Sequence, residues 1–261
     1  MRRRLLPAVV AAVAVALSGC AAVGEDGATT GAGDAAGLSG ALRVSAAASL
    51  GAAFDEIAVA FERENPDVEV RPITYDGSAT LATQIVEGAA ADVFASADES
   101  NMQRVVDAGL ATDPAVFATN TLVIVVPADD PAGVERLADL ADDDVTVVLC
   151  APEVPCGAAS ATLLERAEVA VDPASLEQNV TAVLTKVAAG EADAGLVYAT
   201  DARASADVRT IVPAGAADVV NRYPIAVLDA AADADLARAF VAFVHGEQGQ
   251  RILTELGFGT P

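Results

Sequence analysis

Hydroxyl groups and unpaired backbone amides occur at four points where an expected strand leads into an expected helix. These points are Ser49, Ser78, Cys156-Gly157 and Asn179-Val180, and Tyr198 adds a phenolic hydroxyl at the end of a further strand. A helix N-terminus carries N–H groups without intrahelical partners and about half a positive charge, so it attracts an anion without a cationic side chain. Helix capping explains each residue taken alone. Their repeated placement at strand-to-helix junctions predicts an anion-binding site.

The composition argues against several other kinds of site. The 261-residue chain has 15 Lys and Arg against 38 Asp and Glu, a formal net charge of −23, whereas nucleic-acid binding requires clustered cations. His245 is the only histidine, and we expect it near a helix C-terminus, where an imidazolium interacts favourably with the helix dipole. The sequence contains no Walker A motif and no G-x-S-x-G motif. We therefore expect no catalysis, no nucleic-acid partner and no cofactor.

The N-terminal segment predicts export and attachment of lipid. Arg2 to Arg4 precede an apolar run from Leu5 to Leu17, and Leu17-Ser18-Gly19-Cys20 resembles the lipobox of bacterial lipoproteins. That resemblance implies a signal peptide over residues 1–19, a diacylglyceryl group on Cys20 and a location on the extracytoplasmic face of the cell membrane. Residues 20–40, rich in Gly, Ala and Thr, are typical of a flexible tether. An ordinary cleaved signal peptide, or a twin-arginine signal, is the alternative.

Cys150 and Cys156 are the two cysteines that remain. They flank a five-residue segment with two prolines, in a chain expected to enter an oxidising compartment. We expect a disulfide between them, and two buried free thiols are the alternative.

From Leu42 onward, short apolar segments alternate with segments of helical periodicity. Strands are expected at 42–46, 68–73, 92–95, 122–126, 145–149, 195–198, 209–212 and 225–228. Helices are expected from the Ser49 N-cap to the Asn65-Pro66 break, and at 80–87, 99–108, 134–141, 158–168, 180–188, 233–245 and 248–256. This order indicates an α/β architecture with largely parallel, buried strands. The length of the chain favours two lobes, joined by strands that cross between them, and argues against a single doubly wound sheet.

Six short segments between Leu42 and Phe258 follow one another in a specific order. They are Ala-Ala-Ala-Ser-Leu at 46–50, Ser-Ala-Thr-Leu-Ala at 78–82, the stretch 87–98, Val-Pro-Cys-Gly at 154–157, Gly-Leu-Val-Tyr at 195–198, and Leu-Gly-Phe at 256–258. Together they resemble the periplasmic molybdate-binding proteins of ABC transporters. The resemblance implies a two-lobed periplasmic-binding-protein fold with the ligand in the interlobe cleft. Lobe 1 would comprise residues 42–120 plus 222–261, and lobe 2 residues 121–221.

The same resemblance implies a ligand set. In that family two serine hydroxyls, two backbone amides and one tyrosine hydroxyl hold a tetrahedral oxyanion, so that the metal is bound only through its oxygens. By motif position these donors are the hydroxyls of Ser49 and Ser78, the N–H groups of Cys156 and Val180, and the hydroxyl of Tyr198. The implied function is capture of molybdate and tungstate by lobe closure. The implied partners are an ABC permease and its ATPase, and the protein would be a monomer.

One residue departs from the family pattern. Asp76 lies two residues before Ser78, where the family more often has a small or neutral residue. We expect its carboxylate to cap the turn and to face solvent; if it reached the ligand instead, a protonated oxyanion would become acceptable. One alternative function is thus a receptor for another tetrahedral oxyanion, namely sulfate, thiosulfate or phosphate. Two alternatives of other classes are a secreted hydrolase with Ser49 as nucleophile and a structural surface lipoprotein.

Overall fold

The computed structural model describes residues 37–130 and 132–261. The expected signal peptide, Cys20 and the tether up to residue 36 lie outside the described residues. Within the described part, no helix combines the length and the apolar character needed to span a bilayer.

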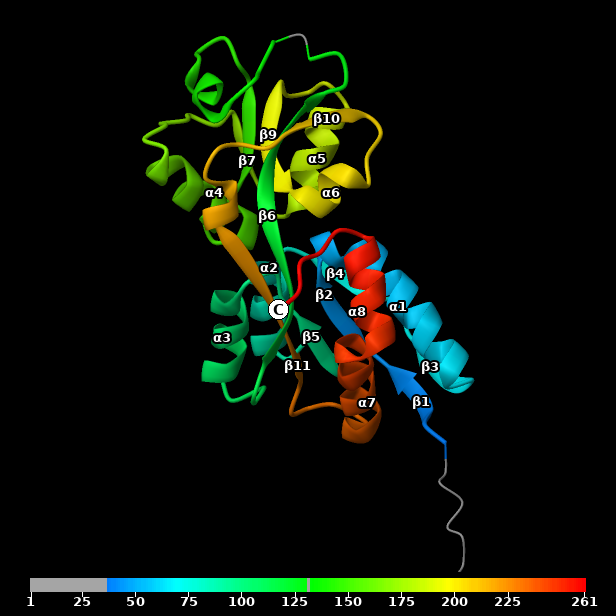
Figure 1. The fold of residues 1–261 in the computed structure, drawn as a ribbon. Coiled ribbons are helices and arrows are strands. Elements are labelled where there is room, and N and C mark those ends of the chain that lie inside the picture. The colour runs from blue at the N-terminus through cyan, green and yellow to red at the C-terminus, as the bar shows by residue number, and fades with distance from the viewer. Residues whose placement is uncertain (1–36, 131) are drawn as a thin grey trace, which may run out of the picture. The chain divides into compact units, whose positions relative to one another are not determined.

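A long mixed sheet runs through both lobes (Figure 1). Its strands lie in the order β4-β2-β5-β11-β6-β9-β7-β8, and β10 pairs with β6. Their bounds are β2 Val44–Ala47, β4 Thr74–Asp76, β5 Val93–Ala95, β6 Ala115–Pro127, β7 Val147–Cys150, β8 Ser175–Glu177, β9 Ala194–Tyr198, β10 Val208–Ile211 and β11 Val220–Val227. A separate two-stranded sheet pairs β1 (Ser39–Leu42) with β3 (Asp67–Val70).

The core of each lobe is parallel, and the strands that cross between the lobes are antiparallel. β2 pairs in parallel with β4 and β5 in the first lobe, and β7 pairs in parallel with β8 and β9 in the second. β6 pairs antiparallel with both β11 and β9. The two long strands run in opposite directions because β6 leaves the first lobe and β11 returns to it (Figure 1). The expectation of largely parallel strands therefore describes each lobe but not the crossing.

Helices flank the sheet in both lobes. They are α1 Gly51–Glu64, α2 Ser78–Val86, α3 Glu99–Asp107, α4 Pro155–Arg166, α5 Val180–Ala188, α6 Ala199–Arg203, α7 Ala234–His245 and α8 Glu247–Glu255, with 3-10 turns η1 Ala48–Leu50, η2 Leu137–Ala141 and η3 Ala216–Asp218. Periodicity explains the longest of them. In α1, Phe54, Ile57 and Phe61 share one buried face. The rings of Phe54 and Phe117 lie 5.7 Å apart, and those of Phe61 and Phe240 lie 5.3 Å apart, which joins α1 to β6 and α7.

Several boundary predictions are wrong for local reasons. Ser49 does not cap α1: it lies inside η1, and the N-cap residue is Leu50. Ser39 and Gly40 belong to β1 and not to the tether, because pairing with β3 outweighs their linker-like composition. The helix expected at 134–141 is reduced to the single 3-10 turn η2. α4 begins at Pro155, which suits the first helical position because its missing N–H would have no partner there.

Candidate functional site

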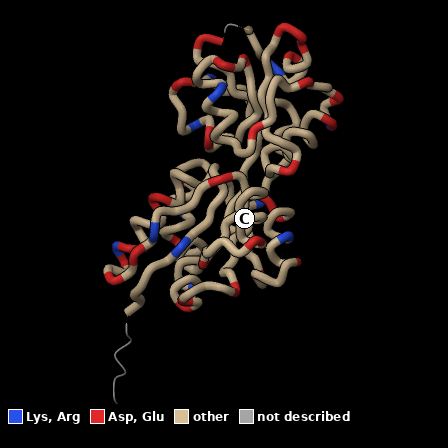
Figure 2. Tube along the Cα trace, turned by 180° about the vertical axis from the view of Figure 1, so that it is seen from behind, with Lys and Arg blue, Asp and Glu red and all other residues tan. Residues whose placement is uncertain are grey.

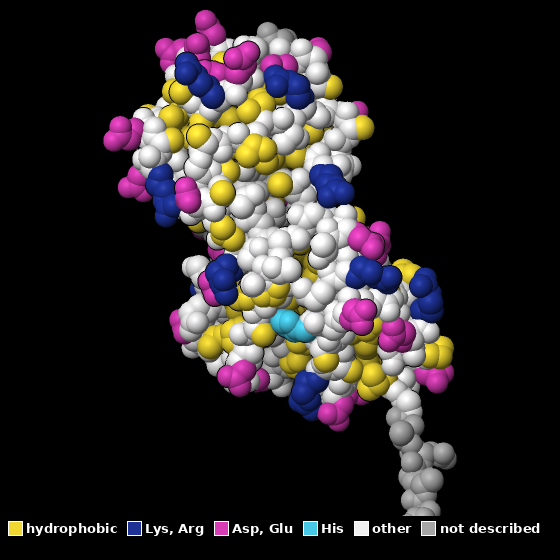
Figure 3. Space-filling view, in the orientation of Figure 1, with side chains coloured by type: hydrophobic (Ala, Val, Ile, Leu, Met, Phe, Trp, Pro, Cys, Tyr) yellow, Lys and Arg dark blue, Asp and Glu magenta, His cyan; other side chains and the backbone are white. Residues whose placement is uncertain are grey.

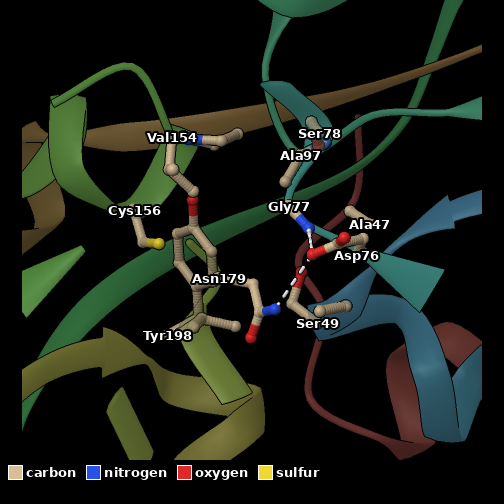
Figure 4. Close-up of a pocket in the computed structure, with 13 residues that line it drawn as sticks. Ala47, Ser49, Asp76, Gly77, Ser78, Ala97, Val154, Cys156, Asn179 and Tyr198 are labelled. Atoms are coloured by element: carbon tan, nitrogen blue, oxygen red, sulfur yellow. Dashed lines mark hydrogen bonds between the residues drawn. The ribbon is translucent and has the colours of Figure 1, made fainter. Parts of the chain in front are cut away.

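All five residues of the expected ligand set line one small pocket between the lobes (Figure 4). The first lobe contributes Ala47, Ala48, Ser49, Asp76, Gly77, Ser78 and Ala97, and the second contributes Val154, Pro155, Cys156, Asn179, Val180 and Tyr198. The pocket encloses a cavity of only about 10 Å³. Pockets for drug-sized ligands hold roughly 300–1,000 Å³. The size therefore suits a small ion better than an organic molecule.

Two serine hydroxyls reach the pocket from the first lobe. Ser49 follows β2 in the η1 turn, is 8% exposed, and has its Oγ 3.1 Å from the Tyr223 hydroxyl. Ser78 is the first residue of α2 and is 1% exposed. Its Oγ accepts a hydrogen bond of 2.9 Å from the backbone N–H of Ala97. Both hydroxyls are thus held in place by a hydrogen-bond partner within the protein.

The second lobe contributes two helix N-termini. Cys156 is the second residue of α4 and Val180 the first residue of α5. Backbone N–H groups in the first turn have no partner within their own helix. Asn179 caps α5, because its side chain accepts a hydrogen bond of 3.0 Å from Ala182 N–H. The N-terminal ends of both helices therefore face the same small volume as the two serines.

A disulfide fixes the start of α4. Cys150 at the end of β7 is bonded to Cys156, with 5.7 Å between the two Cα atoms. The chain turns so tightly here that a Cβ at Gly157 would lie 1.9 Å from the carbonyl oxygen of Ala151. Only glycine fits at that position. The disulfide and this close approach together set where the Cys156 N–H points.

Tyr198 supplies a third hydroxyl at the end of β9. Its side chain is 1% exposed, and its hydroxyl accepts a hydrogen bond of 2.9 Å from the Asn221 amide nitrogen. Burial raises the pKa of this phenol well above its usual value, with the nearby Tyr223 and acidic groups adding to the shift. Tyr198 is therefore a neutral phenol with a hydrogen to donate.

Asp76 caps its turn as predicted, but it is only half-exposed and lines the pocket, so the prediction that it faces solvent instead of the cleft is wrong. Its Oδ1 accepts a hydrogen bond of 2.7 Å from Gly77 N–H, as expected for a turn cap. The same oxygen also accepts a hydrogen bond of 3.0 Å from the side-chain amide of Asn179, on the opposite side of the pocket (Figure 4). The turn that contains Asp76 lies at the edge of the cleft. The Asn179 amide on the other side of the cleft therefore takes the place of a water molecule as the hydrogen-bond partner of the carboxylate.

A layer of polar residues behind the pocket was not predicted from the sequence. Asn120 on β6 and Asn221 on β11 are buried and lie directly opposite each other in the register of the two crossing strands. Tyr223 on β11 is fully buried and contacts Ser49. An asparagine within an apolar strand segment is the only sequence signal that could have marked these positions.

The described residues offer no competing metal centre. Among residues 37–130 and 132–261, no group of three or more His, Cys, Asp or Glu side chains is placed to hold a metal ion. His245 is the last residue of α7, as expected, but desolvation by burial lowers its pKa. Its environment therefore favours the neutral imidazole over the cation that the dipole argument predicted.

A family model described as bacterial extracellular solute-binding protein matches residues 42–259. The chain belongs to this family. The molybdate-binding protein ModA of Mycobacterium tuberculosis (strain ATCC 25618 / H37Rv) is 48% identical to this solute-binding protein over 220 residues, which cover 84% of each chain. The family resemblance found in the sequence is thus confirmed.

Two solved structures share the fold of this solute-binding protein. The Azotobacter vinelandii periplasmic molybdate-binding protein matches with a TM-score of 0.73 at 21% identity, over 84% of this chain and 99% of that chain. The sulfate-binding protein SubI from M. tuberculosis H37Rv matches with a TM-score of 0.72 at 19% identity, over 84% of this chain and 86% of that chain. The predicted two-lobed α/β fold is confirmed. Because the names of these two proteins differ in their anion, the fold by itself does not select one.

The charged side chains of this solute-binding protein lie mainly away from the pocket. Figure 2 shows Asp and Glu spread over the outer turns of both lobes. In the face drawn in Figure 3, the waist between the lobes consists mostly of uncharged side chains, with charged ones at its margins. The one carboxylate in the pocket lining, Asp76, already accepts two hydrogen bonds. Neutral donors therefore dominate the lining.

Proposed function

We propose that this solute-binding protein captures molybdate, and also tungstate, for an ABC importer. The observation that carries the proposal is the convergence of three hydroxyls and two helix N-termini from both lobes on one small pocket. The 48% identity to a protein named for molybdate binding supports the choice of ion. An ABC permease and its ATPase are the proposed partners, and a monomer is the proposed form.

The donor set matches the chemistry of the ion. Molybdate and tungstate are dianions that carry no proton near neutral pH, so their oxygens only accept hydrogen bonds. A water-excluding pocket lined by neutral donors compensates the lost hydration of such an ion, and helix N-termini add favourable partial charge. The Coulombic repulsion by Asp76 is reduced by the two hydrogen bonds that its Oδ1 accepts.

Binding without catalysis is part of the proposal. A hydrolase would need a base to activate Ser49, and the side chain hydrogen-bonded to its Oγ is the phenol of Tyr223. Burial raises the pKa of Tyr223 far above neutrality, so its oxygen does not remove a proton from serine. The hydrolase alternative therefore lacks a general base.

Lobe closure is the proposed mode of capture. We assign residues 42–120 plus 222–261 to lobe 1 and residues 121–221 to lobe 2. This assignment is supported by the pairing of Asn120 with Asn221, where β6 leaves the first lobe and β11 returns. The lobes lie close together at Gly77, where a Cβ would be 2.1 Å from the carbonyl oxygen of Gln178. Such proximity is what a closed form requires.

The anchoring proposal rests on the sequence alone. We propose that residues 1–19 are removed as a signal peptide and that Cys20 carries lipid on the extracytoplasmic face of the membrane. The tether then runs to β1, which begins at Ser39. Mass spectrometry of the protein purified from membranes tests this, because an unmodified N-terminus or a different cleavage site would contradict it.

Thermal unfolding of the chain from Ala21, with molybdate, tungstate, sulfate, thiosulfate or phosphate added separately, tests the ligand. A ligand at 100 times its Kd stabilises the fold by about 2.7 kcal/mol, which raises Tm by roughly 5–10 °C for a chain of this size. Selective stabilisation by molybdate and tungstate is expected. Stabilisation by one of the other anions instead would keep the receptor and replace its ligand, and no shift with any anion would contradict the proposal.

A further inference from the structure

Each hydroxyl in the pocket has a hydrogen-bond partner that limits where its own hydrogen can point. Ser78 is the simplest case. The backbone N–H of Ala97 can only donate, so Ser78 Oγ is the acceptor in the 2.9 Å bond between them. The hydroxyl hydrogen of Ser78 is therefore left for the pocket.

Asn221 determines the direction of the Tyr198 hydroxyl. The side-chain nitrogen of Asn221 lies 3.1 Å from the carbonyl oxygen of Ala97 and 2.9 Å from the Tyr198 hydroxyl. A carbonyl oxygen can only accept, which fixes the amide with its nitrogen toward both partners. The two amide hydrogens are then both in use. Tyr198 accepts one of them, so its own hydrogen is left for the ligand or for the neighbouring hydroxyl of Tyr223.

Asn120 acts on Ser49 through Tyr223. Asn120 Oδ1 accepts a hydrogen bond of 3.0 Å from Thr121 N–H, which fixes the orientation of this second amide. Its nitrogen donates to Thr200 Oγ1 at 2.8 Å and to the Tyr223 hydroxyl at 3.4 Å. Tyr223 thus has its own hydrogen left to donate, and Ser49 Oγ, 3.1 Å away, is placed to accept it. In that arrangement Ser49 keeps its own hydrogen for the ligand.

We propose that Asn120 and Asn221 are positioning residues which make Ser49 and Tyr198 donors, so that these two hydroxyls disfavour an oxyanion that carries a proton and leave Asp76 as the one carboxylate acceptor in the lining. The inference rests on the proposed function, because it concerns selection at the same oxyanion pocket. The O–H group of hydrogen phosphate needs a hydrogen-bond acceptor, whereas these two hydroxyls direct their own hydrogens at the ligand. The resulting contact between two donors is unfavourable. The two asparagines face each other across β6 and β11, and each serves the hydroxyl of one lobe.

Asn120→Asp is the variant that reverses one of these directions. In this variant a carboxylate oxygen replaces the amide nitrogen and accepts a hydrogen bond from the Tyr223 hydroxyl. The Tyr223 oxygen then accepts a hydrogen bond from Ser49. Ser49 is left with a lone pair, instead of a hydrogen, directed at the ligand. Molybdate and hydrogen phosphate are both dianions at mildly alkaline pH, so the added charge weakens both similarly and its effect largely cancels in the ratio of their affinities. We expect that ratio, measured by titration calorimetry, to fall by at least about tenfold.

The Tyr223→Phe background is the matched control, because it interrupts the chain between Asn120 and Ser49. In this background, Asn120→Asp is expected to leave the ratio unchanged while still weakening both anions. An equal loss for both anions in the single variant, or the same change of ratio in the Phe background, would overturn the proposal. Circular dichroism and Tm of each variant establish that it is folded.

Two further outcomes are decided by the same titrations. If Asn120→Asp does not fold, Tyr223→Phe alone leaves Ser49 free to rotate, and a ratio equal to that of the wild type would then overturn the inference. If the wild type binds sulfate and not molybdate, the proposed ligand is wrong, and the same ratio measured with sulfate still tests the role of Asn120. Wild-type binding of molybdate with an unchanged ratio in the variant would refute the positioning role alone.

Discussion

The Asp76 carboxylate accepts a hydrogen bond from the Asn179 side-chain amide, with 3.0 Å between Oδ1 and Nδ2. Asn179 at the same time caps α5, because its Oδ1 accepts from Ala182 N–H. The contact therefore ties the turn before α2 to the helix that presents the Val180 amide. It lies on the pocket wall and bridges both lobes.

Substitution of Asp76 separates the effect of this bridge from the effect of its charge. Asp76→Ala removes the acceptor, and we expect Kd for the dianion to rise about 5–20-fold, as for loss of one charge-assisted hydrogen bond. Asp76→Asn keeps a side-chain oxygen and removes the negative charge, so its affinity is expected to equal or exceed that of the wild type. Titration calorimetry measures both, and an unchanged Kd in Asp76→Ala would show that the bridge contributes nothing to closure.

Gly77 tests whether tight binding needs the close approach of the two lobes. A Cβ at Gly77 would lie 2.1 Å from Gln178 O, so Gly77→Ala should keep the lobes apart and weaken ligand binding by more than about tenfold, or roughly 1.4 kcal/mol. Gly51→Ala is the matched control, because a Cβ there meets nothing within 4 Å. Equal affinities of the two variants would refute the close approach as a condition of binding.

Asp201 on α6 predicts a dependence of stability on pH. Burial raises the pKa of its carboxyl to about 7, and its Oδ2 has no hydrogen-bond partner among the described residues. Between about pH 4 and pH 7, the Asp201 carboxyl is therefore protonated in the folded state and ionised in the unfolded state. Stability contributed by this group is present at the acidic end of that window and is lost as pH rises through the folded pKa.

Chemical denaturation at the two ends of this window measures the effect. We expect the free energy of unfolding to be lower at the neutral end, by about 3 kcal/mol, for this group alone. Asp201→Asn removes the titration, and the difference between variant and wild type isolates it from the opposite trend of His245, whose folded pKa is lowered. Parallel pH profiles of the two proteins would contradict the assignment.

The disulfide is expected to matter for both stability and binding. Replacing Cys150 and Cys156 together by Ser should lower the free energy of unfolding by about 2 kcal/mol, because the cross-linked loop is short. It should also weaken the ligand affinity, because the Cys156 amide loses its covalent tie to β7. Scanning calorimetry with and without ligand separates the two effects. A variant with lower Tm and unchanged Kd would show that the disulfide stabilises the lobe without positioning the amide.

Local patterns in the sequence predicted the elements that local interactions determine. The helix over Val180–Ala188 was predicted at its observed bounds, because Asn179 caps it and its apolar residues repeat at helical spacing. The five residues expected to hold the ligand came from the family resemblance, and they do line one pocket. The local pattern also predicted Ser49 as a helix cap, and that prediction is wrong.

The layer behind the pocket could not be predicted in the same way. Tyr223 contacts Ser49 across 174 positions of sequence, and Asn120 reaches Tyr223 across 103. Such contacts depend on the register between β6 and β11, and a shift of one residue would turn these side chains to the opposite face of the sheet. The orientation of Asp76 likewise depends on a long-range contact, because its partner Asn179 lies 103 positions further along the chain.

The hydrogen-bonded pairing of β6 with β11 also limits how the molecule can move. A two-stranded ribbon bends and twists readily, but it stretches or shears only by breaking its ladder of hydrogen bonds. The lobes can therefore rotate about the ribbon, whereas sliding past one another is resisted. A motion with so few degrees of freedom brings the same atoms back into register at every closure. Opening the pocket therefore need not disturb the alignment on which its next closure depends.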